Sequence, residues 1–498
     1  MSLNRFKILV SRIFKKENVP LLIAVIILSF FVIWTVSKVQ SFKGWDAKYS
    51  IFYRNYQKTG INPKHLFPAY NFLLTDPPSH IYLGKSPLVP LIMYSAARIF
   101  GDRPETYRGM IIIINVLFFS ILSFFIARWW NIKAALWALF FASLSKYALL
   151  FGNTQTPEQL GVVGMFSAIF LYFEWLKTKQ ARFMALCGLA YFIGFAADYC
   201  AFFAMLVICL HWAFFVKEHK RSDLIKLSIL PFITIFYSFL MVSFMLIARI
   251  PIYRWLGRAV ARSTGSLWDR LLGSFISYHL EFIGPLVIIS SLVFFILQHK
   301  RVNRIRYPFR LDILYCLLVS GSLFIIIFGN SYINHKFFVM YLLPFFVVSG
   351  AAGIDILLQQ ISNLWQKHIL ILVIVAIFLA MPFQVKGDNL ILQRFSKHRS
   401  YSPSESLGEF VLKLKPTLKP QDKLLVLRNV GVPFGVTAFY FLWIPTVTSV
   451  GNWDKALIAE DYTLILTTNH ESYKVARNLK NTEVLFTKDD FAFFRKKN

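Results

Sequence analysis

Two charged side chains in the first polar stretch of the chain are suited to transfer chemistry at a membrane surface. Asp46 follows a long apolar run, so its carboxylate is expected at the boundary between membrane and water. There it can serve as a general base or a metal ligand, or simply cap a helix or pair with Lys43 or Lys48. Lys85 lies between apolar residues later in the same stretch, where an ammonium group suits a phosphate. The alternative is a lysine whose side chain only reaches to the interface.

Further charged residues could share this chemistry. Glu158 follows Thr156-Pro157 and is expected either to position a substrate or to place its charge at a helix N-terminus. Arg254, Arg258 and Arg262 recur at every fourth position, so a helix would carry all three on one face. Guanidinium groups arranged in this way bind phosphates, or they contact bulk anionic lipid.

The composition shows what kind of chain must position these residues. The 498 residues are 56% hydrophobic and 16% charged, yet the formal net charge is +29. Soluble domains are about 45–50% apolar and about 25% charged. This balance excludes an ordinary soluble enzyme, a disordered protein and a usual nucleic-acid binder. The four cysteines lie in apolar stretches and show neither disulfide nor metal-site spacing. We therefore expect a polytopic membrane protein.

A helix that crosses a membrane needs about 20 apolar residues, and about eleven stretches meet this requirement. The candidates are Pro20–Val39, Tyr107–Ala127, Ala134–Phe151, Leu160–Trp175, Phe183–Ala197, Phe202–Val216, Leu227–Ile247, Ile283–Gln298, Ile313–Phe328, Phe338–Leu357 and Ile369–Gln384. Asp198 lies between the fifth and sixth stretches. Because a carboxylate that faces lipid is costly, we expect Asp198 in the protein interior or at the outer interface.

Basic residues near the N-terminus predict that this end is cytoplasmic. An odd number of crossings then places the segment after Gln384 outside. The loops 40–106 and 249–282 are also expected outside, although both are rich in lysine and arginine. Positive charge on that side opposes insertion unless it has partners, and the available partners are anionic lipid head groups and phosphates.

The composition becomes more polar after residue 385. Short β-prone runs alternate with helical patterns such as Glu471–Leu479, which predicts a small α/β domain. The three runs are Lys423–Leu427, Tyr462–Leu466 and Glu483–Thr487. We therefore expect a transmembrane domain over residues 1–385 and a soluble extracytoplasmic α/β domain over residues 386–498.

The order of these elements resembles the polytopic glycosyltransferases of the C-type fold (GT-C). Within them it is similar to the family of protein O-mannosyltransferases and bacterial lipid A aminoarabinose transferases. Four short motifs in the expected order carry the resemblance. They are Trp45-Asp46-Ala47-Lys48-Tyr49, Gly84-Lys85-Ser86-Pro87-Leu88 before a helix ending at Phe100-Gly101, Thr156-Pro157-Glu158, and His335-Lys336 before Tyr341-Leu342-Leu343-Pro344.

The resemblance implies an inner-membrane enzyme that transfers a sugar from a polyprenyl-phosphate donor, such as one built on undecaprenyl phosphate, to an acceptor at the outer face. Asp46 would act as base and Glu158 would position the acceptor or the sugar. The donor phosphate would be bound by Lys85, Arg254, Arg258, His335 and Lys336. The basic outer loops favour lipid A or another lipopolysaccharide component as acceptor, while a protein hydroxyl or another glycan stays open.

Two positions depart from the pattern of this family. Ala47 replaces the second acidic residue of the first motif. Gly84 stands where the aminoarabinose transferases have a glutamate that helps to bind a metal, which argues against a bound divalent cation in this chain. No other cofactor is expected.

Two alternatives to an enzyme fit the same spans. A transporter or lipid flippase of the envelope should show repeats or broken helices at the membrane midplane. We find no repeat, and the polar residues concentrate at the outer rim instead. A non-catalytic assembly subunit explains the number of spans but not the outward cluster of acidic and basic residues.

Overall fold

The computed structural model describes most of the helical part of the chain and the main strands of its C-terminal part. The described residues are 23, 53, 56–57, 60–61, 86–151, 158–263, 268–299, 309–334, 336–380, 384–385, 388–389, 418, 422–428, 446–450, 462–467, 470–479, 481–488 and 491–496. The chain divides into two compact units. The first comprises Met1–Lys38, Leu83–Val89 and Arg108–Lys397, and the second comprises Val39–Tyr82, Pro90–Tyr107 and His398–Asn498.

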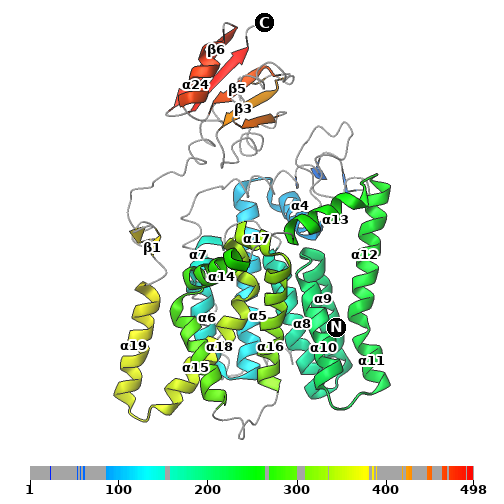
Figure 1. Cartoon of the computed structure of the whole chain (residues 1–498), viewed down its shortest axis with the longest axis vertical. Coiled ribbons are helices and arrows are strands. Elements are labelled where there is room, and N and C mark those ends of the chain that lie inside the picture. Colours follow the sequence, from blue (N-terminus) through cyan, green and yellow to red (C-terminus); the bar gives the residue numbers. More distant parts are fainter. Residues whose placement is uncertain are drawn as a thin grey trace. The chain divides into compact units, whose positions relative to one another are not determined.

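The first unit is a bundle of helices, and Figure 1 shows α13 and α14 lying across one end of it. The helices are α5 (Pro104–Trp129, whose first turn belongs to the second unit), α6 (Ile132–Leu144), α7 (Lys146–Phe151), α8 (Glu158–Thr178), α9 (Ala181–Ala197), α10 (Ala201–Phe215), α11 (Arg221–Leu227), α12 (Ile229–Ile247), α13 (Ile252–Ser263), α14 (Trp268–Phe282), α15 (Pro285–His299), α16 (Phe309–Ile327), α17 (Gly329–Asn334), the 3-10 helix η5 (Lys336–Tyr341), α18 (Leu343–Gln360) and α19 (Leu364–Ala380). Two short strands, β1 (Gln384–Val385) and β2 (Asp388–Asn389), pair antiparallel after them.

The described helices confirm a polytopic helical membrane protein. Five stretches are long and apolar enough to cross a membrane, and a sixth is a pair of helices bent by 104°. The five are Thr106–Trp129, Glu158–Thr178, Arg221–Ile247, Phe309–Ile327 and Leu343–Gln360, and the bent pair is Leu272–Phe282 with Pro285–Leu297. Gly284 forms the corner of that pair with a φ of +100°, a conformation that favours glycine. The first predicted span, Pro20–Val39, lies outside the described residues except for Ile23.

Two predicted spans are divided in the structure, each for a local reason. The predicted 134–151 helix breaks at Ser145, whose hydroxyl accepts a hydrogen bond from the backbone N–H of Ala148 at 3.1 Å and so begins α7. The stretches 183–197 and 202–216, in contrast, form the two separate helices α9 and α10 on either side of Asp198, as predicted. The predicted 338–357 helix begins as η5, and α18 follows with Pro344 in its first turn.

Glycines bring the backbones of neighbouring helices into contact. A Cβ atom added at Gly164 of α8 would lie 2.3 Å from the Cα atom of Gly194 in α9. A Cβ atom at Gly353 of α18 would lie 2.1 Å from the carbonyl oxygen of Ser290 in α15. Membrane helices gain little from the hydrophobic effect among themselves, so such small residues provide close van der Waals packing instead.

The ends of several helices are joined by ion pairs. Arg128 at the end of α5 forms a two-pronged pair with the buried Glu174 of α8, with 2.7 Å between Nη2 and Oε2. Lys179, just after α8, pairs with Asp223 of α11 at 3.0 Å. Such bidentate and partly buried pairs fix the relative positions of the helices they join.

The second unit contains a mixed five-stranded sheet in the order β4-β3-β5-β7-β6. Its elements are β3 (Leu424–Arg428), β4 (Thr446–Val450), β5 (Leu464–Thr467), α24 (His470–Arg477), β6 (Thr482–Lys488) and β7 (Phe491–Lys496). β3 pairs parallel with β4 and β5, whereas β7 pairs antiparallel with β5 and β6. Tyr473 of α24 packs against the core residues Ile465 and Phe494. The predicted mixture of strands and helix in the C-terminal part of the chain is confirmed, whereas the domain bounds 386–498 stay a prediction.

Most of α4 (Leu88–Phe100) also belongs to the second unit. The sequence predicts a short helix ending at Phe100-Gly101, and α4 ends at Phe100. Gly101 then adopts a φ of +90°, and its N–H bonds to the carbonyl of Ala97 at 3.0 Å. A glycine at this position is the usual way to end a helix.

Candidate active site

A buried carboxylate and a buried tyrosine meet at the end of the bundle where α18 begins. The Tyr341 hydroxyl, in the last residue of η5, donates a hydrogen bond of 2.7 Å to Oδ2 of Asp198, which follows α9. Only 3% of Asp198 is exposed, as expected for an interior carboxylate. Gly321 of α16 permits this approach, because a Cβ atom there would lie 2.5 Å from the carbonyl oxygen of Tyr341.

Glu158 lies beside this pair. It is the first residue of α8 and is 1% exposed. One turn later, a Cβ atom added at Gly161 would lie 2.7 Å from Cβ of Asp198, so the start of α8 packs directly on the Asp198 segment. Burial raises the pKa of Tyr341, which precedes the α18 span, and the charges of Asp198 and Glu158 add to that effect. Tyr341 therefore stays protonated and donates to Asp198. We call Glu158, Asp198 and Tyr341 the carboxylate cluster.

A partly buried ion pair lies close to this end of the bundle. Nζ of Lys146, the first residue of α7, lies 2.8 Å from Oε1 of Glu281 near the end of α14. The Lys146 side chain is 6% exposed and that of Glu281 is 34% exposed, so the lysine is shielded from solvent and the carboxylate only partly. The pair ties α14 to α7. Sequence reasoning missed this residue, although a lysine within an apolar run is itself a signal of an interior partner.

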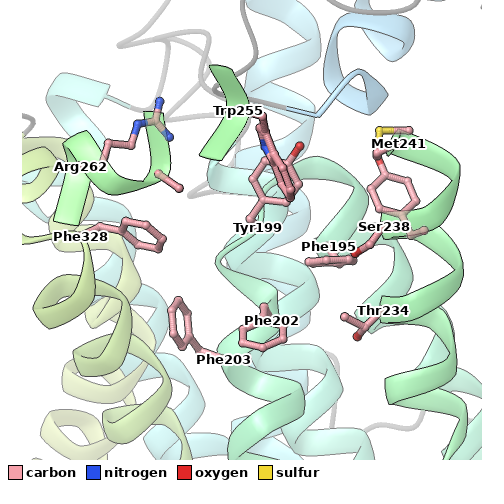
Figure 2. A pocket seen from close by; sticks show the side chains of 12 residues that line it. Phe195, Tyr199, Phe202, Phe203, Thr234, Ser238, Met241, Trp255, Arg262 and Phe328 are labelled. Atoms are coloured by element: carbon pink, nitrogen blue, oxygen red, sulfur yellow. The ribbon is translucent and has the colours of Figure 1, made fainter. Parts of the chain in front are cut away.

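An apolar pocket of about 280 Å³ lies between α9, α10, α12, α13 and α16. Its lining residues are Phe195, Tyr199, Phe202, Phe203, Thr234, Tyr237, Ser238, Met241, Trp255, Ala259, Arg262 and Phe328. Figure 2 shows Trp255 and Arg262 at the α13 edge and Phe202 and Phe203 farther along the pocket. Tyr199 follows Asp198 in the chain, and its ring packs edge-to-face against that of Trp255, with the centroids 6.0 Å apart. The pocket is therefore adjacent to the carboxylate cluster.

Ser86, which follows Lys85 in the sequence, is anchored at the same pocket. Ser86 is fully buried, and its hydroxyl forms a hydrogen bond with the hydroxyl of Tyr237, one of the pocket residues on α12. A polar contact of this kind fixes the chain next to Ser86 against α12.

The structure describes only some of the residues predicted from the sequence. Asp46, Gly84, Lys85 and His335 lie outside the described residues. Glu158 joins Asp198 and Tyr341, and Arg254 and Arg258 belong to α13, the helix that brings Arg262 to the pocket. Lys336 is the first residue of η5. Among the described residues, no group of three His, Cys, Asp or Glu side chains is placed to hold a metal ion.

Comparisons with known proteins found similarity in fold but none in sequence. No family model matches the sequence, and no curated protein matches it. The structure, in contrast, is similar to ArnT from Cupriavidus metallidurans bound to undecaprenyl phosphate, with a TM-score of 0.65 and 12% sequence identity over 95% of this chain and 98% of that one.

Two further structures share the architecture. The archaeal oligosaccharyltransferase AglB from Archaeoglobus fulgidus, in complex with an inhibitory peptide and a dolichol-phosphate, has a TM-score of 0.56 and 11% identity over 90% of this chain and 69% of that one. The arabinofuranosyltransferase AftD from Mycobacteria has a TM-score of 0.53 and 10% identity over 95% of this chain and 40% of that one. The chain has the GT-C fold of membrane glycosyltransferases, which confirms the resemblance indicated by its motifs.

Proposed function

We propose that this protein is a membrane glycosyltransferase that moves a sugar from a polyprenyl-phosphate donor to an acceptor at the outer face of the inner membrane. The observation that carries the proposal is the apolar pocket with Arg262 at one edge, next to a buried carboxylate cluster, in a chain of GT-C fold. An apolar pocket with few polar groups suits a prenyl chain, and a guanidinium at its edge suits the attached phosphate. The ArnT and AglB structures contain undecaprenyl phosphate and dolichol-phosphate, respectively.

The proposed reaction needs a base for the acceptor and cations for the leaving group. Asp46 removes the proton from the acceptor hydroxyl or amino group, and the freed electron pair bonds to the anomeric carbon of the sugar. The bond from that carbon to the phosphate oxygen breaks, and its electron pair leaves with the phosphate. Lys85, whose neighbour Ser86 is fixed beside the pocket, stabilises the developing charge.

Other basic residues complete the proposed donor site. Arg254 and Arg258 share α13 with Arg262, and Lys336 begins η5, which leads to Tyr341. His335 directly precedes Lys336 in the sequence. Glu158 positions the acceptor or the sugar from within the carboxylate cluster. We propose a lipid A or lipopolysaccharide type of acceptor, because the basic loops 40–106 and 249–282 suit a phosphorylated surface.

Mass spectrometry of envelope lipids and glycans tests the function. Cells that lack the protein should lose one sugar mass, a hexose, a pentose or an amino sugar, from a single acceptor class, and the wild-type chain should restore it. This comparison names both substrates. Identical lipid and glycan masses in the two strains would contradict the proposal. A change confined to the distribution of a lipid between the two leaflets would favour a flippase instead.

The orientation of the chain in the membrane forms a separate part of the proposal. We place the N-terminus in the cytoplasm and the segment after residue 385 outside, because basic residues near membrane spans are retained on the cytoplasmic side. A reporter enzyme that is active only outside the cytoplasm, joined after Asn498, should be active. The same reporter joined before Met1 is the control and should be silent. The reverse result would overturn the orientation.

A further inference from the structure

A second pocket, of about 420 Å³, lies at the opposite end of α18 from Tyr341. Its lining residues come from the N-terminal parts of α6 and α19 and from the end of α18. Figure 1 shows that α19 begins at the end of the bundle away from α13 and α14. The charged members are Lys133 of α6, Asp355 of α18 and Lys367 of α19, and the aromatic members are Trp137 and Phe140 of α6. None of these residues belongs to the proposed active site.

Asp355 brings a negative charge into this pocket. It is 5% exposed, and its Oδ2 atom accepts hydrogen bonds of 2.7 Å from both Asn131 Nδ2 and Gln359 Nε2. Neutral amides hold the carboxylate in place but do not neutralise it. Within the described part of the chain, no side chain or backbone group donates to the second oxygen, Oδ1. Asp355 lines the pocket, so a cationic ligand group there can reach the carboxylate and offset the cost of burying its charge.

The two lysines bring positive charge to the same pocket without neutralising Asp355. Among the described residues, neither Lys133 nor Lys367 forms an ion pair with a carboxylate. The pocket therefore holds two cations and one anion that are separated rather than paired. A ligand that carries both a negative and a positive group can satisfy them together.

The surface next to the pocket indicates that such a ligand also has an apolar part. Helix α19 begins beside the pocket with Trp365, which is 77% exposed, and continues with Leu372, which is 67% exposed. Apolar side chains this exposed on a membrane helix face lipid, and tryptophan is common at the level of lipid head groups. Leu136 and Ile371 extend the same apolar character into the pocket wall.

We propose that this pocket binds the head group of a zwitterionic aminophospholipid, of the phosphatidylethanolamine type. Its phosphate lies between Lys133 and Lys367, its ammonium group contacts Oδ1 of Asp355, and its acyl chains follow the apolar face of α19. An anionic head group such as phosphatidylglycerol would satisfy the lysines but would place a phosphate near a carboxylate that lacks a cation. The bound lipid joins the start of α19 to α6 and α18, so it should stabilise the bundle against thermal unfolding.

Native mass spectrometry of the purified full-length protein tests this proposal. The probes are phosphatidylethanolamine, phosphatidylglycerol with the same acyl chains, and inorganic phosphate. We expect phosphatidylethanolamine to bind at least about tenfold more tightly than phosphatidylglycerol and to raise the melting temperature. Inorganic phosphate should produce neither effect. Equal affinity for the two lipids, or the same stabilisation by phosphate alone, would overturn the proposal.

Variants assign the binding to this pocket. The double variant Lys133→Gln/Lys367→Gln should lose at least about tenfold in affinity for phosphatidylethanolamine. The matched control is Lys217→Gln/Lys220→Gln, which removes two exposed lysines outside the pocket and should bind as the wild type does. Asp355→Asn keeps an acceptor for the two amides and should abolish the preference for phosphatidylethanolamine. If that variant does not fold, the lysine variant decides alone: unchanged affinity there rejects the site.

Discussion

Replacement of Asp46 by asparagine should reduce sugar transfer about 10²–10⁴-fold, the range that a positioned general base contributes. The amide has the size of the carboxylate but cannot accept the acceptor's proton. The measurement is the fraction of modified acceptor in the envelope, followed by the same mass spectrometry in cells that carry only the variant. Expression and melting temperature should match the wild type, because an isosteric change next to a membrane surface removes little packing.

Two further variants make this prediction specific. Glu218→Gln removes an exposed carboxylate in the loop between α10 and α11 and should leave transfer unchanged. Lys85→Ala should weaken donor binding and also lower the maximal rate, so transfer should recover only in part as the donor concentration rises, whereas the Asp46→Asn variant should not respond to donor concentration. Full transfer by Asp46→Asn would remove this residue as the base while leaving the fold assignment intact.

Replacement of Gly164 by alanine should destabilise the bundle by about 3 kcal/mol or more. Overpacking usually costs about 1–3 kcal/mol, and here the added methyl group meets backbone atoms rather than a side chain that could change its rotamer. The three nearest atoms to the added Cβ, at 2.3, 2.5 and 2.6 Å, all belong to the backbone of α9. The two helices must therefore separate. Thermal unfolding in detergent provides the measurement. Transfer should fall as well, because the packing of α8 on α9 also places Glu158, at the start of α8, beside Asp198.

Gly109→Ala is the matched control for this variant. Gly109 also lies near the start of a long apolar helix, α5, but a Cβ atom there meets nothing within 4 Å. Alanine is the better helix former by about 1 kcal/mol, so this variant should be as stable as the wild type or slightly more stable. Equal melting temperatures for Gly164→Ala and Gly109→Ala would show that α8 and α9 do not pack as described.

The helices could be predicted from the sequence because a run of about 20 apolar residues is typical of a membrane-crossing helix. The breaks within them were harder to see. Ser145 is a polar residue in a long apolar run. It ends α6 because its hydroxyl accepts a hydrogen bond from the N–H of Ala148 in the next helix. The strands β4 and β7 were not predicted, although β7 lies in the middle of the sheet order between β5 and β6.

Local motifs likewise identified only part of the candidate site. Glu158 is marked by the preceding proline, and the arginines of α13 are marked by their spacing. The Asp198–Tyr341 hydrogen bond joins residues 143 positions apart, and only the packing of α8, α9 and α16 brings them together. The apolar pocket has no motif, because its mostly aromatic lining residues come from four helices, α9, α10, α12 and α13, and from the turns that follow α9 and α16.

Helix α12 determines how a substrate can reach the pocket. In the span Arg221–Ile247, only 22% of the most apolar window is buried, and α12 still provides four of the residues that line the pocket. Its polar contacts with neighbouring segments include those of Thr234 with Tyr191 and of Tyr237 with Ser86. Because so little of its surface is buried, α12 can move away from the bundle into the surrounding lipid. A chain dissolved in the bilayer can therefore arrive by two-dimensional diffusion, and its prenyl units need never be exposed to water.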